Sequence, residues 1–360
     1  MSDEPRIHVY AADTGGCGNY RLRWPTTAAR TAGVDVHDCH GQPLGQLTVT
    51  RNGPRITTRI TDPPDCDIIV LQRVTRADHV AAIPTLQALG YTIVVDIDDD
   101  LAALPQGHPY RVAADPTRRP HNNRTWLNEA CRQADLVTVS TPALAERYGR
   151  HGRVRVLPNC VPARYLDVTA ARTWDRVGWT GSTVTHVDDL RVCGTGVRDA
   201  IRTTGATFVA VGTGAGVQDQ LALDTAPEAT GWVDLDQYPT VYAGLDAAIV
   251  PLQPNRFNEA KSWLKGLEAA ALGVPFVASP TGPYRQLHDL GAGLLAVTPD
   301  DWNRHITNLM GSPQMRADIA GQGQAVAADW TIERRVDAWV DAWHHARTLH
   351  ARRHRELRIA

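Results

Sequence analysis

Short apolar runs rich in β-branched residues recur along this chain, and stretches able to form helices separate most of them. Runs of this length are typical of buried parallel strands. Six lie in the first half, at residues 7–10, 34–36, 67–71, 91–96, 136–140 and 154–157, and six in the second, at 176–179, 207–211, 231–233, 247–252, 275–279 and 294–297. The alternation predicts an α/β chain with two doubly wound, Rossmann-like domains. Residues 42–64 receive no element.

Length and composition agree with two domains in one chain. A chain of 360 residues is too long for one ordinary domain. A net charge of −2 gives no reason to expect a nucleic-acid partner. Six scattered cysteines suggest neither a zinc site nor a disulfide framework, and no signal peptide or run of about 20 apolar residues is present. We therefore expect a cytoplasmic protein with reduced thiols.

The segment Leu245–Ser279 reads as a strand, a polar loop, a helix and a second strand. The apolar strand is 247–252, and helical periodicity is predicted from Glu259, with Gly273 ending the helix and Pro275 preventing its continuation. Lys261, Lys265 and Glu268 are spaced i, i+4, i+7 along that helix. The amino end of a helix favours a phosphate, and a carboxylate further along suits the hydroxyls of a ribose.

Lys261 and Lys265 are the only lysines among 37 basic residues. Their position at the beginning of one helix favours a site for the diphosphate of a nucleotide sugar. The alternative is an exposed helix face, with Lys265 and Glu268 forming a weak i, i+3 pair.

The sequence F-N-E-A-K-S-W-L-K-G-L-E-A-A-A-L-G-V-P-F-V-A-S, residues 257–279, resembles the donor signature of glycosyltransferases with the GT-B fold. It is most similar to the retaining family-4, or group 1, enzymes, in a K-S-x-L-K-x-L-E form. The resemblance implies two facing Rossmann-like domains around an interdomain cleft, with Glu268 on the donor ribose. The first glutamate of the usual signature is replaced by Ala260, which leaves Asn258, Glu259 and Lys261 as nearby substitutes.

The resemblance also divides the chain. It implies an acceptor-side domain at residues 1–163 and a nucleotide-sugar domain at 164–330, followed at 331–360 by a helix that returns to the first domain and a basic tail. We expect Ile332, Val336, Trp339, Val340 and Trp343 to form the apolar stripe of that helix. The tail reads as a solvated face, with peripheral contact to an anionic membrane surface as the alternative.

A glycine-rich loop, A-D-T-G-G-C-G-N-Y-R, follows the first strand. Arg21 occupies the place where a dinucleotide fingerprint requires its third glycine, so this is not an NAD site. In the resemblance, Gly16 and Gly18 let the backbone approach the donor, and Arg21 clamps a phosphate. A tight turn with a salt-bridged arginine is the alternative.

Four aspartates cluster after the fourth strand, in V-V-D-I-D-D-D-L. Such carboxylates require a cation, a hydroxyl-rich ligand or helix N–H donors. The doubled six-strand plan disfavours a metal-dependent GT-A enzyme, so Asp98 or Asp99 would bind or deprotonate the acceptor hydroxyl. Capping of the next helix is the alternative.

Three loops of the second half complete the predicted site. Gly181 and Ser182 would meet the donor phosphates, with His186 a ligand or a cap; Trp232 would lie where the donor base is read, or in the core. Residues 211–217 read as a turn. The full set of predicted donor-binding residues is Gly16, Gly18, Gly181, Ser182, Trp232, Asn258, Lys261, Ser262, Lys265 and Glu268, and the predicted catalytic residues are Lys261, Asp98, Asp99 and Arg21.

The leading hypothesis is a retaining hexosyltransferase that needs no metal and no cofactor, using a nucleotide-diphosphate sugar and an acceptor hydroxyl on a polysaccharide, lipid, natural product or protein. Two alternatives stay open. A nucleotide-sugar 2-epimerase would use the same fold without an acceptor, and a non-catalytic sugar-nucleotide binding subunit would fit the missing first glutamate.

Overall fold

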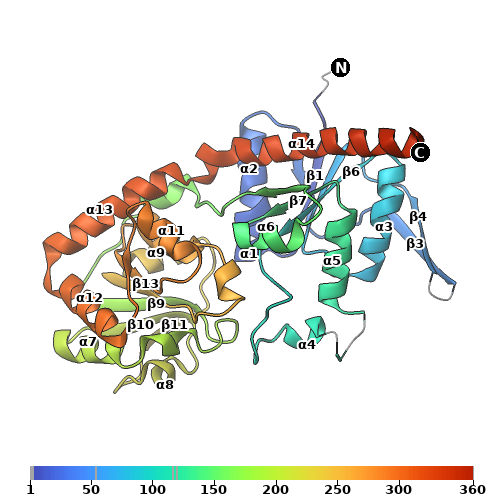
Figure 1. The fold of residues 1–360 in the computed structure, drawn as a ribbon. Helices are drawn as coiled ribbons and strands as arrows, with labels where there is room; N and C mark the ends of the chain where they lie inside the picture. Colours follow the sequence, from blue (N-terminus) through green and yellow to red (C-terminus); the bar gives the residue numbers. More distant parts are fainter. Residues whose placement is uncertain (1–3, 53–54, 116, 119–120, 360) are drawn as a thin grey trace. The chain divides into compact units, whose positions relative to one another are not determined.

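The computed structural model describes residues 4–52, 55–115, 117–118 and 121–359. Its contacts divide the chain into two compact units. Unit 1 comprises Met1–Ala103, Tyr110–Asn159 and Ile332–Ala360, and unit 2 comprises Leu104–Pro109 and Cys160–Thr331 (Figure 1). In the part of the chain described, no helix is long and apolar enough to cross a membrane.

Unit 1 is built on a six-stranded parallel sheet with the order β2-β1-β5-β6-β7-β8. The strands are β1 (Ile7–Tyr10), β2 (Val36–Asp38), β5 (Ile68–Gln72), β6 (Thr92–Ile97), β7 (Leu136–Val139) and β8 (Val154–Val156). All residues of β5, β6 and β7 are buried, which explains why these strands are apolar without alternation. The six predicted strands are confirmed, with the second shifted by two residues.

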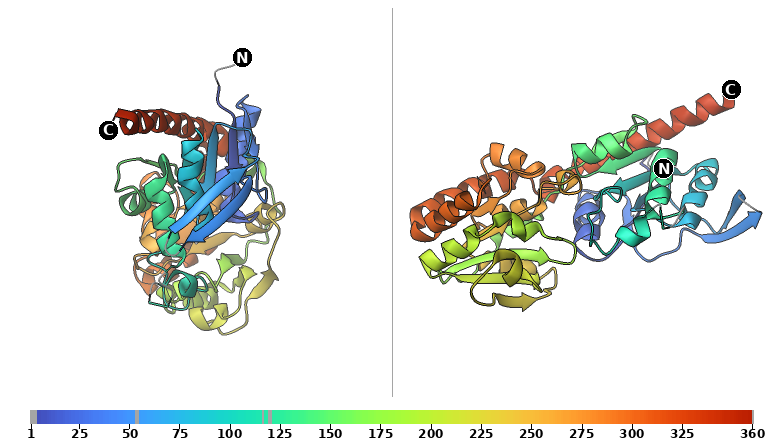
Figure 2. Two further views of the ribbon diagram at one scale, coloured as in Figure 1. Left: turned by 90° about the vertical axis from the view of Figure 1, so that its right-hand side faces the viewer. Right: turned by 60° about the horizontal axis from the view of Figure 1, so that its bottom comes forward.

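Residues 42–64, which received no element from the sequence, contain a hairpin. Strands β3 (Gln46–Asn52) and β4 (Arg55–Thr61) pair antiparallel as a separate two-stranded sheet. The hairpin packs beside α3 (Ala77–Ala88), where the Thr85 hydroxyl donates to the Thr58 carbonyl at 3.2 Å (Figure 2). Threonine and isoleucine, both frequent in these two strands, are β-branched residues that favour strands.

The remaining helices of unit 1 surround its sheet. They are α1 (Gly16–Gly18), a π-helical turn η1 (Asn19–Arg23), α2 (Trp24–Thr31), α4 (Arg111–Ala114), α5 (Asn123–Gln133), α6 (Pro142–Tyr148) and α14 (Ile332–Ile359). The long C-terminal helix α14 packs along α2 (Figure 1). Its apolar stripe includes Ile332, Val336 and Trp343, all buried, and the Trp339 indole N–H donates to the Arg21 carbonyl at 3.0 Å.

Unit 2 contains a second parallel sheet, with the order β11-β10-β9-β12-β13-β14. The strands are β9 (Arg176–Ser182), β10 (Thr207–Thr213), β11 (Glu228–Gly231), β12 (Ala247–Val250), β13 (Phe276–Ala278) and β14 (Leu294–Leu295). Within the unit this is the strand order 3-2-1-4-5-6 of the Rossmann fold. The prediction of six strands in this half is confirmed, although β11 begins three residues before the predicted run.

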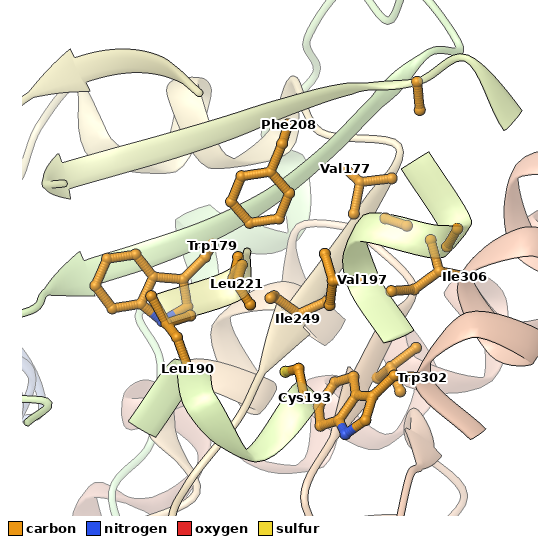
Figure 3. Close-up of a cluster of buried hydrophobic side chains, with 14 of the residues drawn as sticks. Val177, Trp179, Leu190, Cys193, Val197, Phe208, Leu221, Ile249, Trp302 and Ile306 are labelled. Atoms are coloured by element: carbon orange, nitrogen blue, oxygen red, sulfur yellow. The ribbon is translucent and has the colours of Figure 1, made fainter. Parts of the chain in front are cut away.

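Helices connect these strands. They are α7 (Gly196–Thr204), α8 (Val217–Leu221), α9 (Tyr238–Ala243), α10 (Leu264–Ala271), α11 (Pro283–Asp289), α12 (Pro299–Gly311) and α13 (Pro313–Asp329), with shorter 3₁₀ turns η2 (Ala163–Asp167), η3 (Asp189–Cys193) and η4 (Asn258–Ala260). One apolar cluster joins sheet and helices; Trp179, Leu190, Cys193 and Trp302 are among its fully buried members (Figure 3). This core anchors both β9 and η3, whose ends carry polar residues described below.

Candidate functional site at the second sheet

The strand order of unit 2 reverses between its adjacent strands β9 and β12. The loops that leave the carboxyl ends of such a pair run in opposite directions, and ligands of open α/β sheets bind at this point. Helix α10 connects β12 to β13, so it begins at the same edge of the sheet. The site is therefore made from the loop after β9, the loop after β12 and the beginning of α10.

The predicted helix from Glu259 is wrong at its beginning. Residues 258–260 form the 3₁₀ turn η4, Lys261 is extended, and α10 starts at Leu264. The Ser262 hydroxyl accepts a hydrogen bond from the Leu264 N–H at 3.4 Å, a local serine turn that competes with helix. Lys265 and Glu268 are on the helix, whereas Lys261 precedes it. The predicted end is confirmed, because Gly273 follows the helix with a φ of +64°.

Lys265 contacts two neighbouring residues of β9, Trp179 and Thr180. Its Nζ donates to the Thr180 carbonyl at 2.6 Å and lies 5.2 Å from the centroid of the Trp179 ring. A Cβ added to Gly181 would come 2.4 Å from this Nζ, so glycine is required for the close approach. Burial, together with the nearby Lys261, lowers the pKa of Lys265 to about 7. The ammonium group is therefore poised to gain from a bound anion.

Lys261 lies over a small aromatic platform. Its Nζ is 4.5 Å from the ring centroid of Phe257, and the His108 ring meets the same phenyl group edge-on at 5.5 Å. His108 belongs to the short segment Leu104–Pro109, which clusters with unit 2. Burial and the Lys261 charge lower the pKa of His108, so this imidazole is neutral at pH 7. Sequence reasoning missed His108, because no local pattern links it to residues 150 positions away.

Glu268 is buried one turn along α10 from Lys265. The Tyr238 hydroxyl donates to Glu268 Oε2 at 2.9 Å and lies 3.1 Å from the Thr180 hydroxyl. Only 4% of Glu268 is exposed. Tyr238 thus orients the carboxylate that was predicted to hold a ribose, and it was not among the predicted site residues.

Asn258 has a structural role, and its predicted contact with the donor sugar stays a prediction. Its side-chain amide donates to Asp189 Oδ1 at 2.7 Å and to the Gln253 carbonyl at 3.0 Å. Asp189 Oδ1 also accepts from the Gln253 N–H at 3.0 Å, and Asp189 Oδ2 lies 2.9 Å from His186 Nδ1. Asp189 therefore ties the loop after β9 to the loop after β12. The H-x-x-D spacing of His186 and Asp189 was a signal available in the sequence.

Ser182 and Trp232 lie at two other points of the same edge. Ser182 ends β9, and its carbonyl accepts the His186 N–H at 2.9 Å. Trp232 follows the edge strand β11 and is 76% exposed, so the alternative that placed it in the core is wrong. An exposed indole at this edge offers a flat apolar face to a ligand.

Arg21 of unit 1 does not have the predicted role of a phosphate clamp. Its guanidinium is fully buried and makes a bidentate ion pair with Asp96, with the closer contact at 2.6 Å. It also donates to the Leu157 carbonyl and to Asn159 Oδ1 at 2.9 Å. A group so enclosed acts on the fold of unit 1, as the salt-bridge alternative proposed.

Three of the four clustered aspartates, which lie at the end of β6 and just after it, pair with arginines. Asp98 pairs with Arg73 and Asp100 pairs with Arg147, as Asp96 does with Arg21. Burial raises the pKa of Asp98, but the Arg73 guanidinium more than offsets this, so the pKa lies below its ordinary value. Asp98 is thus a paired carboxylate, and its predicted contact with the acceptor stays a prediction. Asp99, by contrast, is only half-buried.

The glycine loop after β1 turns around Asp13. Asp13 Oδ1 accepts the N–H groups of Gly15 at 2.9 Å and Gly18 at 3.0 Å. A Cβ on Gly18 would come 1.9 Å from the Asp13 carbonyl oxygen, whereas one on Gly16 would meet nothing within 4 Å. Gly18 is therefore required by the turn itself, and Gly16 leaves its surface open.

Residues 175–312, which contain every element of the site in unit 2 except the segment Leu104–Pro109, match the family model described as "Glycosyl transferases group 1". Unit 2 carries a group 1 glycosyltransferase domain. The predicted resemblance to group 1 glycosyltransferases is confirmed for this domain, and with it, at the level of this domain, the prediction of a glycosyltransferase; the K-S-x-L-K-x-L-E variant and retention stay predictions. Comparison with curated protein sequences gave no match.

Solved structures show the same fold along nearly the whole chain. HepE of Anabaena, solved with UDP-glucose, is 16% identical, with a TM-score of 0.60 over 94% of this chain and 100% of that chain. Sucrose-phosphate synthase of Thermosynechococcus elongatus is 16% identical, with a TM-score of 0.62 over 94% and 98%. A glycosyltransferase of Rickettsia africae is 10% identical, with a TM-score of 0.65 over 96% and 99%. These similarities confirm the predicted GT-B class, with its two Rossmann-like units.

Proposed function

We propose that this chain transfers a hexosyl group from a nucleotide-diphosphate sugar to an acceptor hydroxyl. The observation that carries the proposal is the Lys265 ammonium, held 2.6 Å from the Thr180 carbonyl at the switch point of a group 1 glycosyltransferase domain. Structures of the same fold bind such ligands, since HepE was solved with UDP and with UDP-glucose, and TarM of Staphylococcus aureus with UDP.

The donor would lie along the carboxyl edge of the second sheet. Lys265, Lys261 and the first N–H groups of α10 offset the charge of the diphosphate, which grows as the sugar departs. The Glu268 carboxylate, oriented by Tyr238, accepts hydrogen bonds from ribose hydroxyls. The exposed Trp232 indole stacks on the base.

The remaining parts of the proposal concern the reaction itself. Two ammonium groups supply the positive charge at the diphosphate, which supports transfer without a metal, and retention follows from the resemblance to the retaining group. Asp99 is proposed to contact the acceptor, because it is the least buried aspartate of its cluster. We propose a cytoplasmic enzyme. Peripheral membrane contact through the basic end of α14 stays a prediction. Two basic residues of that end already have partners in unit 1, since His350 is bonded to Asp135 and Arg353 to the Gln133 carbonyl.

Transfer assays with two variants test this function. Purified protein is incubated with UDP-, GDP-, ADP- and dTDP-glucose and a panel of sugar, lipid, small-molecule and peptide acceptors. We expect Lys261→Ala and Glu268→Ala to abolish transfer and weaken donor binding while both variants stay folded and unfold cooperatively in a thermal scan. Arg304→Ala, which removes an exposed arginine on α12, is the control and should change neither property.

The outcome also separates the alternative functions. Full activity in both variants would show that the site is misplaced. Conversion of the donor into its 2-epimer without any acceptor would identify an epimerase. Binding without turnover across the acceptor panel would identify a binding subunit.

A further inference from the structure

The His186 imidazole has a fixed orientation that the proposed function does not yet use. His186 belongs to the loop after β9, and its backbone N–H donates to the Ser182 carbonyl at 2.9 Å. Its ring Nδ1 lies 2.9 Å from Asp189 Oδ2, and its ring meets the edge of Trp179, the indole under Lys265, with centroids 6.3 Å apart. Backbone, carboxylate and indole together define where the ring can lie.

Asp189 determines which nitrogen of the ring carries the proton. Its carboxylate is 2% exposed and accepts from Gln253 N–H and from the Asn258 amide as well as facing His186. Burial raises the pKa of Asp189, but the hydrogen bonds from His186 and the Gln253 N–H and the charge of Lys261 outweigh this, so the pKa lies below its ordinary value and the group is ionised. An ionised carboxylate only accepts hydrogen bonds, so Nδ1 is protonated.

Burial and the charges around the ring determine whether Nε2 carries a proton. Burial, followed by the charge of Lys265, lowers the pKa of His186 to about 3, with Lys261 acting in the same direction and Asp189 against it. The imidazole is thus neutral, and Nε2 carries a lone pair. In the part of the chain that the structure describes, the bond to Asp189 is the one hydrogen bond of the ring.

Because Nε2 carries a lone pair, its partner in the nucleotide sugar must be a group that donates a hydrogen bond. The oxygens of a nucleotide-sugar diphosphate carry no hydrogen at neutral pH, so they cannot donate to Nε2. The hydroxyls of the sugar next to the diphosphate can. In the proposed function the two ammonium groups bind the diphosphate, and their charges act on His186, so a hydroxyl of the adjoining sugar is the complementary partner for the ring.

We propose that His186 Nε2 accepts a hydrogen bond from one hydroxyl of the transferred sugar and that Asp189 positions the ring for this contact. The proposal rests on the proposed function, since it requires a nucleotide sugar at this site. It makes His186 a determinant of sugar specificity, in a domain that has alanine at 260 where the usual signature has a glutamate.

Calorimetric titration of the whole chain tests the contact. The ligands are UDP, GDP, ADP and dTDP, each compared with its glucose conjugate. His186→Phe keeps a ring and removes the acceptor, and His186→Gln keeps an acceptor. For the base that binds, we expect His186→Phe to weaken the nucleotide sugar about 10-fold and the diphosphate alone less than twofold. His186→Gln should restore most of the affinity.

Deoxy donors identify the hydroxyl. For one monodeoxy position, the wild type should lose about 10-fold in affinity relative to the parent sugar, while His186→Phe loses almost nothing further. Equal weakening of diphosphate and nucleotide sugar, or additive losses at every deoxy position, would overturn the proposal. Failure of the wild type to bind any nucleotide would instead refute the proposed function, and the inference with it.

Discussion

Donor binding should depend on pH through Lys265, with a sign that the structure determines. The pKa of Lys265 is lowered to about 7 by burial and by Lys261. A bound diphosphate neutralises its surroundings and should return the pKa toward the ordinary value of about 10.4. Binding therefore takes up a proton, so affinity is highest below pH 7 and falls as the pH rises through 7.

The size of this effect follows from the two pKa values. With a free pKa of about 7 and a bound pKa near 10.4, affinity should fall about 30-fold between pH 6.0 and pH 8.5, which corresponds to about 2 kcal/mol. The assay is calorimetric titration of the nucleotide sugar that binds best, because its diphosphate does not titrate in this range. In Lys265→Arg the cation stays charged, so the same ratio should be close to one.

Two results would refute this reasoning. A flat profile in the wild type would show either that Lys265 does not lose its proton near pH 7 or that it does not contact the diphosphate. An equally steep profile in Lys265→Arg would assign the titration to another group. The stability of the ligand-free protein should depend on pH in the opposite direction to the affinity. Between pH 7 and about 10 the unfolded chain still holds the Lys265 proton and the folded chain does not, so the free energy of unfolding rises with pH in this range.

Three further predictions concern single positions. Gly181→Ala should weaken nucleotide-sugar binding at least 10-fold in calorimetry, because its Cβ would lie 2.4 Å from Lys265 Nζ. Gly321→Ala on α13 is the matched control, because its Cβ would meet nothing within 4 Å. Equal affinity in both variants would contradict the prediction. Arg21→Ala should lower the free energy of unfolding by about 3–5 kcal/mol in urea, since it leaves Asp96 buried without its partner, whereas Arg76→Ala at the exposed pair with Asp78 should cost less than about 1 kcal/mol. A loss of transfer in Arg21→Ala without loss of stability would restore the predicted phosphate clamp. Trp232→Ala should weaken binding of the free diphosphate about fivefold to 10-fold at an unchanged thermal midpoint, because the side chain is exposed and packs against little of the core; unaltered affinity would remove Trp232 from the site.

The strands were predictable because buried parallel strands need little beyond short β-branched apolar runs. All twelve runs read from the sequence correspond to observed strands, and the strand order at β9 and β12 then brings Gly181 and Lys265 to one edge. The hairpin β3–β4 was missed. Its strands are rich in threonine and arginine, so they lack the apolar signal of the other strands.

The errors at the site concern partners that lie far apart in the sequence. The clustered aspartates were expected to need a cation, a hydroxyl-rich ligand or helix N–H donors, but Asp96, Asp98 and Asp100 pair with arginines at 21, 73 and 147, each from a different part of the chain. The helix before Leu264 was predicted from spacing alone, whereas Ser262 and the extended Lys261 interrupt it. His108 and Tyr238 join the site only through the fold.

A diphosphate is proposed to bind at the beginning of α10, beside Lys261 and Lys265. Because these are the only lysines of the chain, protein labelled with ¹³C at lysine Cε should give two side-chain resonances in an NMR spectrum. We expect one resonance to titrate near pH 7 in the free protein, and a nucleoside diphosphate to shift both resonances and raise that pKa by at least one unit. Two lysine resonances that titrate above pH 10 and do not respond to any nucleoside diphosphate would contradict this proposal.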